Sequence, residues 1–204
     1  MSTYFYVTIS REYGSGGREI AIRMSELLGI PCYDREIVEN AAEKLHLSVS
    51  EIDNNEETAK KSKSYHPFSF SAAVPAVSGT TKEQDEIFKA QSDVIYDLAR
   101  NGSAIFVGRC ADFVLADEAN VVNIFIYAPF DLRVDYIKQR DGMTVKAAEK
   151  LVDEIDTSRD EYRRQFTGYN CYDPKFRDIM IDSSFLGVEQ TAEVLADMIK
   201  KKYM

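Results

Sequence analysis

Tyr4-Phe-Tyr-Val-Thr-Ile-Ser10, followed at once by Arg11-Glu-Tyr-Gly-Ser-Gly-Gly-Arg-Glu-Ile-Ala-Ile22, is the stretch that decides the fold. Its first part is alternating and β-rich, which predicts a strand over residues 4–10. Its second part is a glycine-rich turn that leads into an amphipathic helix. In such a turn, backbone N–H groups and the positive end of the helix dipole both face an anion. The stretch therefore predicts an α/β chain with a phosphate site at its first turn.

The residues of this predicted phosphate loop are Gly14, Ser15, Gly16, Gly17, Arg18 and Glu19. Glycines permit positive φ and let an anion come close to the backbone. The usual loop ends in Gly-Lys-Ser/Thr, but the matching positions read Gly17-Arg18-Glu19. Arg18 can present a planar cation where that lysine stands. Glu19 cannot imitate a hydroxyl, and it brings negative charge near the phosphate unless Mg²⁺ or an arginine intervenes. The alternative to a phosphate site is an ordinary strand-to-helix turn, in which the glycines serve only packing.

Strands and helices alternate along the rest of the chain. Short apolar runs predict strands over residues 4–10, 30–33, 104–108, 121–127 and 178–182. Helical spacing predicts helices over residues 17–28, 35–45, 84–100, 111–115, 130–140, 145–166 and 188–202, with a short helical piece at 51–54. Residues 55–81 lack clear periodicity, which is typical of a functional lid or a disordered segment. The alternation predicts a parallel sheet covered by helices on both faces, whose ligands bind beyond the carboxyl ends of the strands.

Composition narrows the classes of function. The chain has 204 residues, which suits a single domain, and a net charge of −9, which disfavours a general nucleic-acid binder. Its apolar runs are too short to span a membrane, and the N-terminus lacks a basic region followed by an apolar signal core. The three cysteines are widely spaced, so we expect reduced thiols and neither a disulfide framework nor a zinc site. Together these features predict a cytoplasmic protein.

Several charged residues lie where a ligand of such a sheet would bind. Arg109 follows Gly108 at the end of a predicted buried strand. The planar guanidinium group of Arg109 can bind a phosphate there or form a structural ion pair. Arg159 and Arg163 are four residues apart on one helix face. That arrangement suits a transferring phosphoryl group, but it is also common on exposed charged helices. Asp34 follows the second strand and can meet a substrate hydroxyl or cap the next helix.

Three motifs resemble those of one known family. Ile9–Ala21, Leu28–Ile37 and Val107–Ala111 are similar to segments of the cytidylate-kinase-like family, divergent relatives of cytidylate kinase and other nucleoside monophosphate kinases. The resemblance covers nearly the whole chain. It implies an α/β, P-loop kinase-like fold of three αβα layers around a five-stranded parallel sheet. It also implies a helical lid within residues 141–175 and an acceptor-side insertion over residues 55–81.

The resemblance also implies roles for the candidate residues. The loop from Gly14 to Glu19 would hold the donor phosphates of ATP, together with Mg²⁺. The catalytic residues would be Arg18, Arg159 and Arg163, with Asp160 beside the last two. The residues that bind the acceptor would be Asp34, Arg109 and Arg164. The resemblance assigns no metal ligand.

The chain departs from true cytidylate kinases at two places. Those enzymes have Gly-Lys-Gly-Thr or a close variant where this chain has Gly17-Arg18-Glu19-Ile20. They have an acidic residue after Gly-Arg, where this chain has Cys110. The first departure bears on Mg·ATP binding, and the second bears on recognition of cytosine or of the sugar.

Three functions are compatible with these features. The leading one is a phosphotransferase that moves the γ-phosphoryl group of ATP to a small phosphorylated acceptor such as CMP. The second is a nucleotide or phosphate binder that has lost transfer. A dinucleotide-binding oxidoreductase is weaker: Asp34 lies about twenty residues past Gly14, but the last glycine of that pattern would fall at Glu19. We expect nucleotides as partners, without nucleic acid or membrane, and the oligomeric state stays open, with a homodimer as one option.

Overall fold

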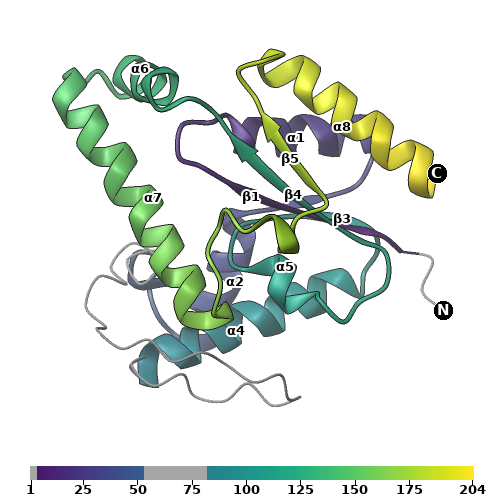
Figure 1. The fold of residues 1–204 in the computed structure, drawn as a ribbon. Helices are drawn as coiled ribbons and strands as arrows, with labels where there is room; N and C mark the ends of the chain where they lie inside the picture. Colours follow the sequence, from purple (N-terminus) through teal and green to yellow (C-terminus); the bar gives the residue numbers. More distant parts are fainter. Residues whose placement is uncertain (1–3, 53–81) are drawn as a thin grey trace.

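The computed structural model describes residues 4–52 and 82–204, and within them five strands form one sheet (Figure 1). The strands are β1 (Tyr6–Arg11), β2 (Cys32–Tyr33), β3 (Ala104–Val107), β4 (Val121–Tyr127) and β5 (Ile179–Asp182). Their order is β2-β3-β1-β4-β5, and every neighbouring pair is parallel. The predicted parallel sheet is therefore confirmed, with β1 at its centre.

Helices cover both faces of this sheet. They are α1 (Gly17–Leu28), α2 (Arg35–Leu45), α4 (Lys82–Ala99), α5 (Ala111–Val114), α6 (Phe130–Asp141), α7 (Val145–Thr167) and α8 (Gly187–Tyr203), with the short 3₁₀ turn η2 (Pro174–Phe176). One apolar core joins the sheet to α1 and α8, and another joins it to α2, α4 and α5. α6 and α7 pack on each other, and α7 extends from α6 beside the sheet to the end of α4 (Figure 1).

The alternation in β1 explains why the strand lies between two layers. Val7 and Ile9 belong to the core with α1 and α8, whereas Tyr6 belongs to the core with α2 and α4. Successive side chains of a strand point to opposite faces, so a central strand must be apolar on both. α1 meets the first core with Ile20 and Met24, four residues apart on one face. The same stretch that predicted the fold thus forms its centre.

Several predicted boundaries agree with the structure and a few differ. The helices at 17–28 and 35–45 and the strand at 121–127 have the predicted bounds. β1 continues to Arg11, β2 begins only at Cys32, after Pro31, and η2 was not predicted. Residues 49–52 are helical. The end of the predicted helix at 51–54 and the whole insertion at 55–81 lie outside the described residues.

All three cysteines are free thiols, which agrees with the expectation that they form no disulfide. Across residues 4–52 and 82–204, no helix combines the length and the apolar character that crossing a membrane requires.

Candidate functional site

The glycine-rich loop lies at the edge of the sheet where the parallel strands end. It follows β1, and its residue Gly16 is the N-cap of α1. Gly14 and Gly16 have φ values of 79° and 74°, in the left-handed region that favours glycine. The first N–H groups of a helix have no partner within the helix, so those of α1 can bind an anion. The loop therefore has the backbone conformation that the predicted phosphate loop requires.

Two serines fix the loop to the ends of β4 and β5. Ser15 Oγ donates to the carbonyl oxygen of Glu12 at 2.9 Å, and the carbonyl oxygen of Ile126 lies 3.3 Å from the same hydroxyl. Ser183 Oγ donates to the carbonyl oxygen of Ser15 at 2.6 Å. Both serines are buried. The loop is thus held in shape before any ligand arrives.

The loop is also bonded to α6 and α7 through one buried arginine, Arg133. The Tyr13 N–H donates to Asp156 Oδ1 at 2.7 Å, and Arg133 Nη1 donates to the Tyr13 carbonyl oxygen at 3.0 Å and to Asp156. Arg133 Nε lies 3.2 Å from Glu12 Oε2. Burial raises the pKa of Glu12, although the Ala128 N–H and Arg133 oppose that effect. Loop, α6 and α7 therefore form one connected network.

Arginines of α6 and α7 meet on the ring of Tyr13. The guanidinium carbons of Arg140 and Arg159 each lie 5.4 Å from the centre of that ring. Arg140 Nη2 also donates to the Tyr13 hydroxyl at 2.7 Å. Such contacts are cation–π interactions. They bring two cations, one from α6 and one from α7, to Tyr13, the residue that precedes the predicted phosphate loop.

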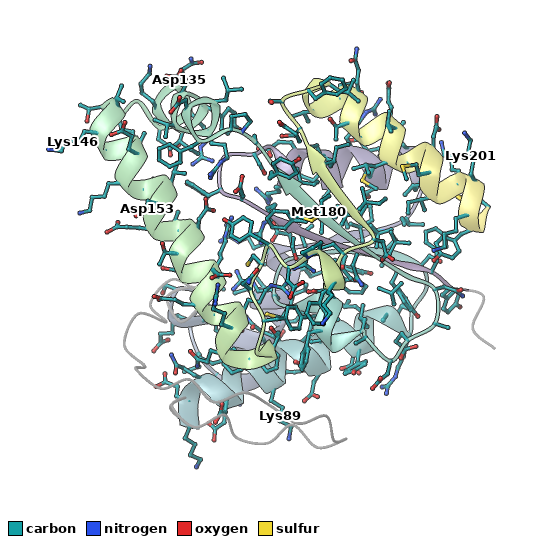
Figure 2. The ribbon with its side chains drawn as sticks, in the orientation of Figure 1. Lys89, Asp135, Lys146, Asp153, Met180 and Lys201 are labelled. Atoms are coloured by element: carbon teal, nitrogen blue, oxygen red, sulfur yellow. The ribbon has the colours of Figure 1, made fainter. Side chains whose placement is uncertain are left out.

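A cleft of about 460 Å³ lies beside this network, between α7, the first turn of α6 and Tyr172. Its lining includes Phe130, Tyr172, Asp153 and Arg164. Lys146 and Asp153 mark the course of α7 in Figure 2. The volume falls within the range of small-molecule sites, about 300–1,000 Å³.

The two side chains that replace the usual lysine and hydroxyl both have partners. Arg18 Nε lies 2.8 Å from Asp34 Oδ2, and the Arg18 side chain is 60% exposed. Asp34 is the N-cap residue of α2, as the interpretation of Asp34 as a helix cap expects, but its side chain makes no capping hydrogen bond. Glu19 Oε1 accepts a hydrogen bond from the Tyr136 hydroxyl at 3.1 Å. Burial and then Glu19 raise the pKa of Tyr136.

The turn after β3 has an unusual backbone. Gly108, Arg109 and Cys110 have consecutive φ values of 73°, 53° and 52°. A left-handed conformation costs about 1–2 kcal/mol for a residue with a Cβ, and such strain tends to occur at functional sites. Arg109 Nε and Nη1 are shielded from solvent. The strained turn therefore holds Arg109 at the strand end where the sequence predicted a ligand-binding arginine.

A family model decides the relationship: the cytidylate kinase-like family matches residues 6–185. The chain belongs to this family. It is 20% identical to a cytidylate kinase of Thermoplasma acidophilum and 22% identical to one of Thermoplasma volcanium, each over 195 residues. These matches cover 95% of this chain and 91% and 90% of the two relatives.

Solved structures agree with this fold. An uncharacterized protein from Eubacterium ventriosum is similar with a TM-score of 0.69 and 24% identity, over 96% of this chain and 98% of that one. A shikimate kinase from Acinetobacter baumannii is similar with a TM-score of 0.55 and 13% identity, over 99% and 96%. At these identities the likeness concerns the fold alone, which is that of the P-loop kinases.

In this cytidylate kinase-like protein, Arg163 lies in a buried ion cluster. Arg163 Nη1 and Nη2 donate to the two carboxylate oxygens of Asp112 at 2.8 and 2.7 Å, and Nη2 donates to Ser10 Oγ at 3.0 Å. Arg177 Nη1 donates to the same carboxylate at 2.6 Å. Burial would raise the pKa of Asp112, but Arg163 and Arg177 together lower it to about 2.

The predicted site residues therefore fall into separate groups. The loop and Arg159 meet through Tyr13, whereas Arg163 contacts Asp112. The exposed Arg18 pairs with Asp34. Arg164 Nε lies 2.6 Å from Asp160 Oδ2, at the edge of the cleft. Arg159 and Arg163, which share a helix face, thus contact different residues, Tyr13 and Asp112.

Sequence reasoning gave no role in the site to three residues of this region: Arg11, Asp112 and Arg133. Asp112 could have been noticed, because a carboxylate within the short apolar segment 111–115 requires a buried partner. Arg11 is the last residue of β1, at the edge of the sheet where ligands bind. Nothing in the sequence distinguishes Arg133 from Arg140, the exposed arginine of the same helix.

Proposed function

We propose that this protein transfers the γ-phosphoryl group of ATP to a small phosphorylated acceptor, namely a nucleoside monophosphate such as CMP. The observation that carries the proposal is the meeting of a preformed phosphate loop with cations from another part of the fold, at Tyr13. Phosphoryl transfer requires such an arrangement, because the two phosphates must be held in line and their charge must be offset. Membership of the cytidylate kinase-like family supports the same conclusion.

In the proposed reaction, the loop N–H groups and the start of α1 bind the donor phosphates. Arg159 lies within reach of them, over Tyr13. Arg18 is exposed and can exchange Asp34 for a phosphate at little cost. An oxygen of the acceptor phosphate is the nucleophile, so the protein needs no nucleophilic side chain. Arg109, Asp34 and Arg164 are the proposed contacts of the acceptor.

Arg163 is the proposed catalytic residue that must change its partners most. Its two terminal nitrogens are bonded to Asp112 and Ser10, and its side chain is 5% exposed. Contact with the phosphoryl group would require Arg163 to give up part of this bonding. Arg177 would still neutralise Asp112 after such a change.

Mg²⁺ fits the loop through Glu19. Oε1 of Glu19 accepts a hydrogen bond from the Tyr136 hydroxyl, and a carboxylate has a second oxygen that can bind a cation. Mg²⁺ binds through one or two carboxylates together with phosphates and water. The ion would offset the charge of Glu19 and of the donor phosphates.

The second candidate is a nucleotide binder without transfer, and the sequence Gly17-Arg18-Glu19 favours it. It predicts binding of ATP or of a nucleoside monophosphate without product. The first candidate predicts a nucleoside diphosphate from at least one acceptor.

The two candidates are separated by incubating the protein with ATP, Mg²⁺ and each nucleoside monophosphate in turn, beside a calorimetric titration. Gly16→Ala should abolish product, because the added Cβ in the loop would lie 2.8 Å from Cγ2 of Val188 at the start of α8. Gly29→Ala is the matched control: its φ of +66° imposes similar strain, but no atom lies within 4 Å of the added Cβ. Binding without product would favour the second candidate. If the protein neither binds a nucleotide nor forms product, both candidate functions are refuted.

A further inference from the structure

Arg11, the last residue of β1, occupies the space beside two glycines of the candidate site. A Cβ on Gly17 would lie 2.6 Å from Arg11 Cβ and 3.0 Å from its Cγ. A Cβ on Gly108 would lie 2.5 Å from Arg11 Nη1 and 3.2 Å from its Cζ. The aliphatic part of Arg11 therefore passes the start of α1, and its guanidinium lies against the turn after β3.

The conformation of Gly17 does not require glycine. Gly14, Gly16 and Gly108 have positive φ values, whereas Gly17 is not among the residues with positive φ and is the first residue of α1. A helical position accepts any ordinary side chain as far as its φ is concerned. The reason for glycine at 17 is thus space, and Arg11 fills that space.

This explains how the loop can lack its usual lysine. The first lysine of the chain is Lys44, so no lysine stands anywhere near the loop in sequence. Arg18 is a cation of the loop itself, but its side chain is 60% exposed and pairs with Asp34. Arg11 approaches from the strand end, between the phosphate loop and the turn that holds Arg109. A cation at that place lies between the proposed donor and acceptor phosphates.

We propose that Arg11 is a catalytic residue that donates hydrogen bonds to the transferring phosphoryl group and takes over the role of the missing loop lysine. The inference rests on the proposed phosphoryl transfer for its catalytic part. A planar guanidinium can contact two phosphate oxygens at once, which suits a group that bridges donor and acceptor. The lack of side chains at Gly17 and Gly108 then leaves room for the side chain of Arg11.

The first test measures binding of inorganic tripolyphosphate by calorimetry and, where product forms, kcat. Arg11→Met keeps most of the aliphatic packing and removes the charge. It should weaken tripolyphosphate binding about tenfold or more and lower kcat about 10²-fold or more. Arg11→Lys should restore part of both. Arg23→Met is the control, because Arg23 lies on α1 and pairs with Glu26 and Glu189.

Unchanged tripolyphosphate binding in folded Arg11→Met would overturn the proposal. Should Arg11→Met fail to fold, the same measurements on Arg11→Lys decide: binding and kcat equal to those of the original protein would overturn it.

The second test uses the space shared with Gly17. Gly17→Ala should lower the melting temperature of the original protein more than that of Arg11→Gly, because the added methyl group lies nearest to the Cβ of Arg11. Arg11→Gly/Gly17→Lys should bind tripolyphosphate more tightly than Arg11→Gly, because a lysine can then occupy the loop. Equal effects of Gly17→Ala in both backgrounds would contradict the shared space. If the original protein forms no product with any acceptor, phosphoryl transfer fails. The tripolyphosphate and melting measurements then still decide whether Arg11 is the phosphate-binding cation.

Discussion

Asp112→Asn is expected to destabilise the protein strongly, because this buried carboxylate neutralises two buried arginines. The side chains of Asp112, Arg163 and Arg177 are 3%, 5% and 1% exposed. Asparagine fits the same space but carries no charge, so two guanidinium groups would lose their counter-charge. Removing one partner of a buried ion pair costs about 3–5 kcal/mol of unfolding free energy. We expect a loss of that size at neutral pH.

The pKa of Asp112 gives the matching pH dependence. Burial opposes ionisation, but Arg163 and then Arg177 outweigh it and lower the pKa from 3.8 to about 2. Since one pKa unit corresponds to about 1.4 kcal/mol, this shift contributes about 2 kcal/mol to folding. The folded-state pKa lies below the unfolded value. The contribution is therefore complete above the unfolded value and is lost as pH falls through the folded pKa.

Urea unfolding, followed by circular dichroism at neutral pH and at about pH 3, measures both effects. Asp97→Asn is the control, because Asp97 pairs with Lys44 on the surface and should lose far less stability. Asp112→Asn should also flatten the acid dependence of the unfolding free energy. A loss below about 1 kcal/mol at neutral pH would refute the reasoning, as would an unchanged acid dependence.

Three further predictions concern the loop and its surroundings. Arg18→Ala should abolish turnover of the proposed reaction, and near-normal product formation would remove the role given to Arg18. Asp156→Ala takes a partner from buried Arg133 and frees the Tyr13 N–H, so it should cost about 1–3 kcal/mol in thermal unfolding. Burial, and then Asp34, raise the pKa of the Cys32 thiol to about 11, so iodoacetamide should label folded Cys32 far more slowly than the urea-unfolded chain at neutral pH. Equal labelling rates would contradict that pKa.

The fold could be predicted because its decisive signals are local. The apolar run at 121–127 became β4, whose Val122, Ile124 and Ile126 pack in the core with α1 and α8. Gly29 ends α1 in the left-handed conformation, as a glycine after the last apolar turn indicates. These features depend on neighbours along the chain. The insertion at 55–81 lacks such periodicity, and the described residues leave its prediction untested.

The candidate site could be predicted only where it depends on the ends of strands. Gly108 and Arg109 follow β3 and lie at the ligand edge for that reason. The partners of α7 could not be predicted in the same way. Arg159 and Arg163 share a helix face, but four residues separate them by about 6 Å along the axis. Arg159 therefore reaches Tyr13, whereas Arg163 reaches Asp112.

Gly16 and Gly17 show most clearly why the loop could not be interpreted from its sequence alone. As neighbours in a glycine-rich turn they look equivalent, and both suggest a need for positive φ. Gly16 has that conformation, whereas Gly17 begins α1 and lies against Arg11. The absence of a side chain at 17 is therefore explained by a cation arriving from β1. A loop without its lysine need not lack a cation: if Arg11 supplies it, the altered sequence is compatible with an active phosphotransferase.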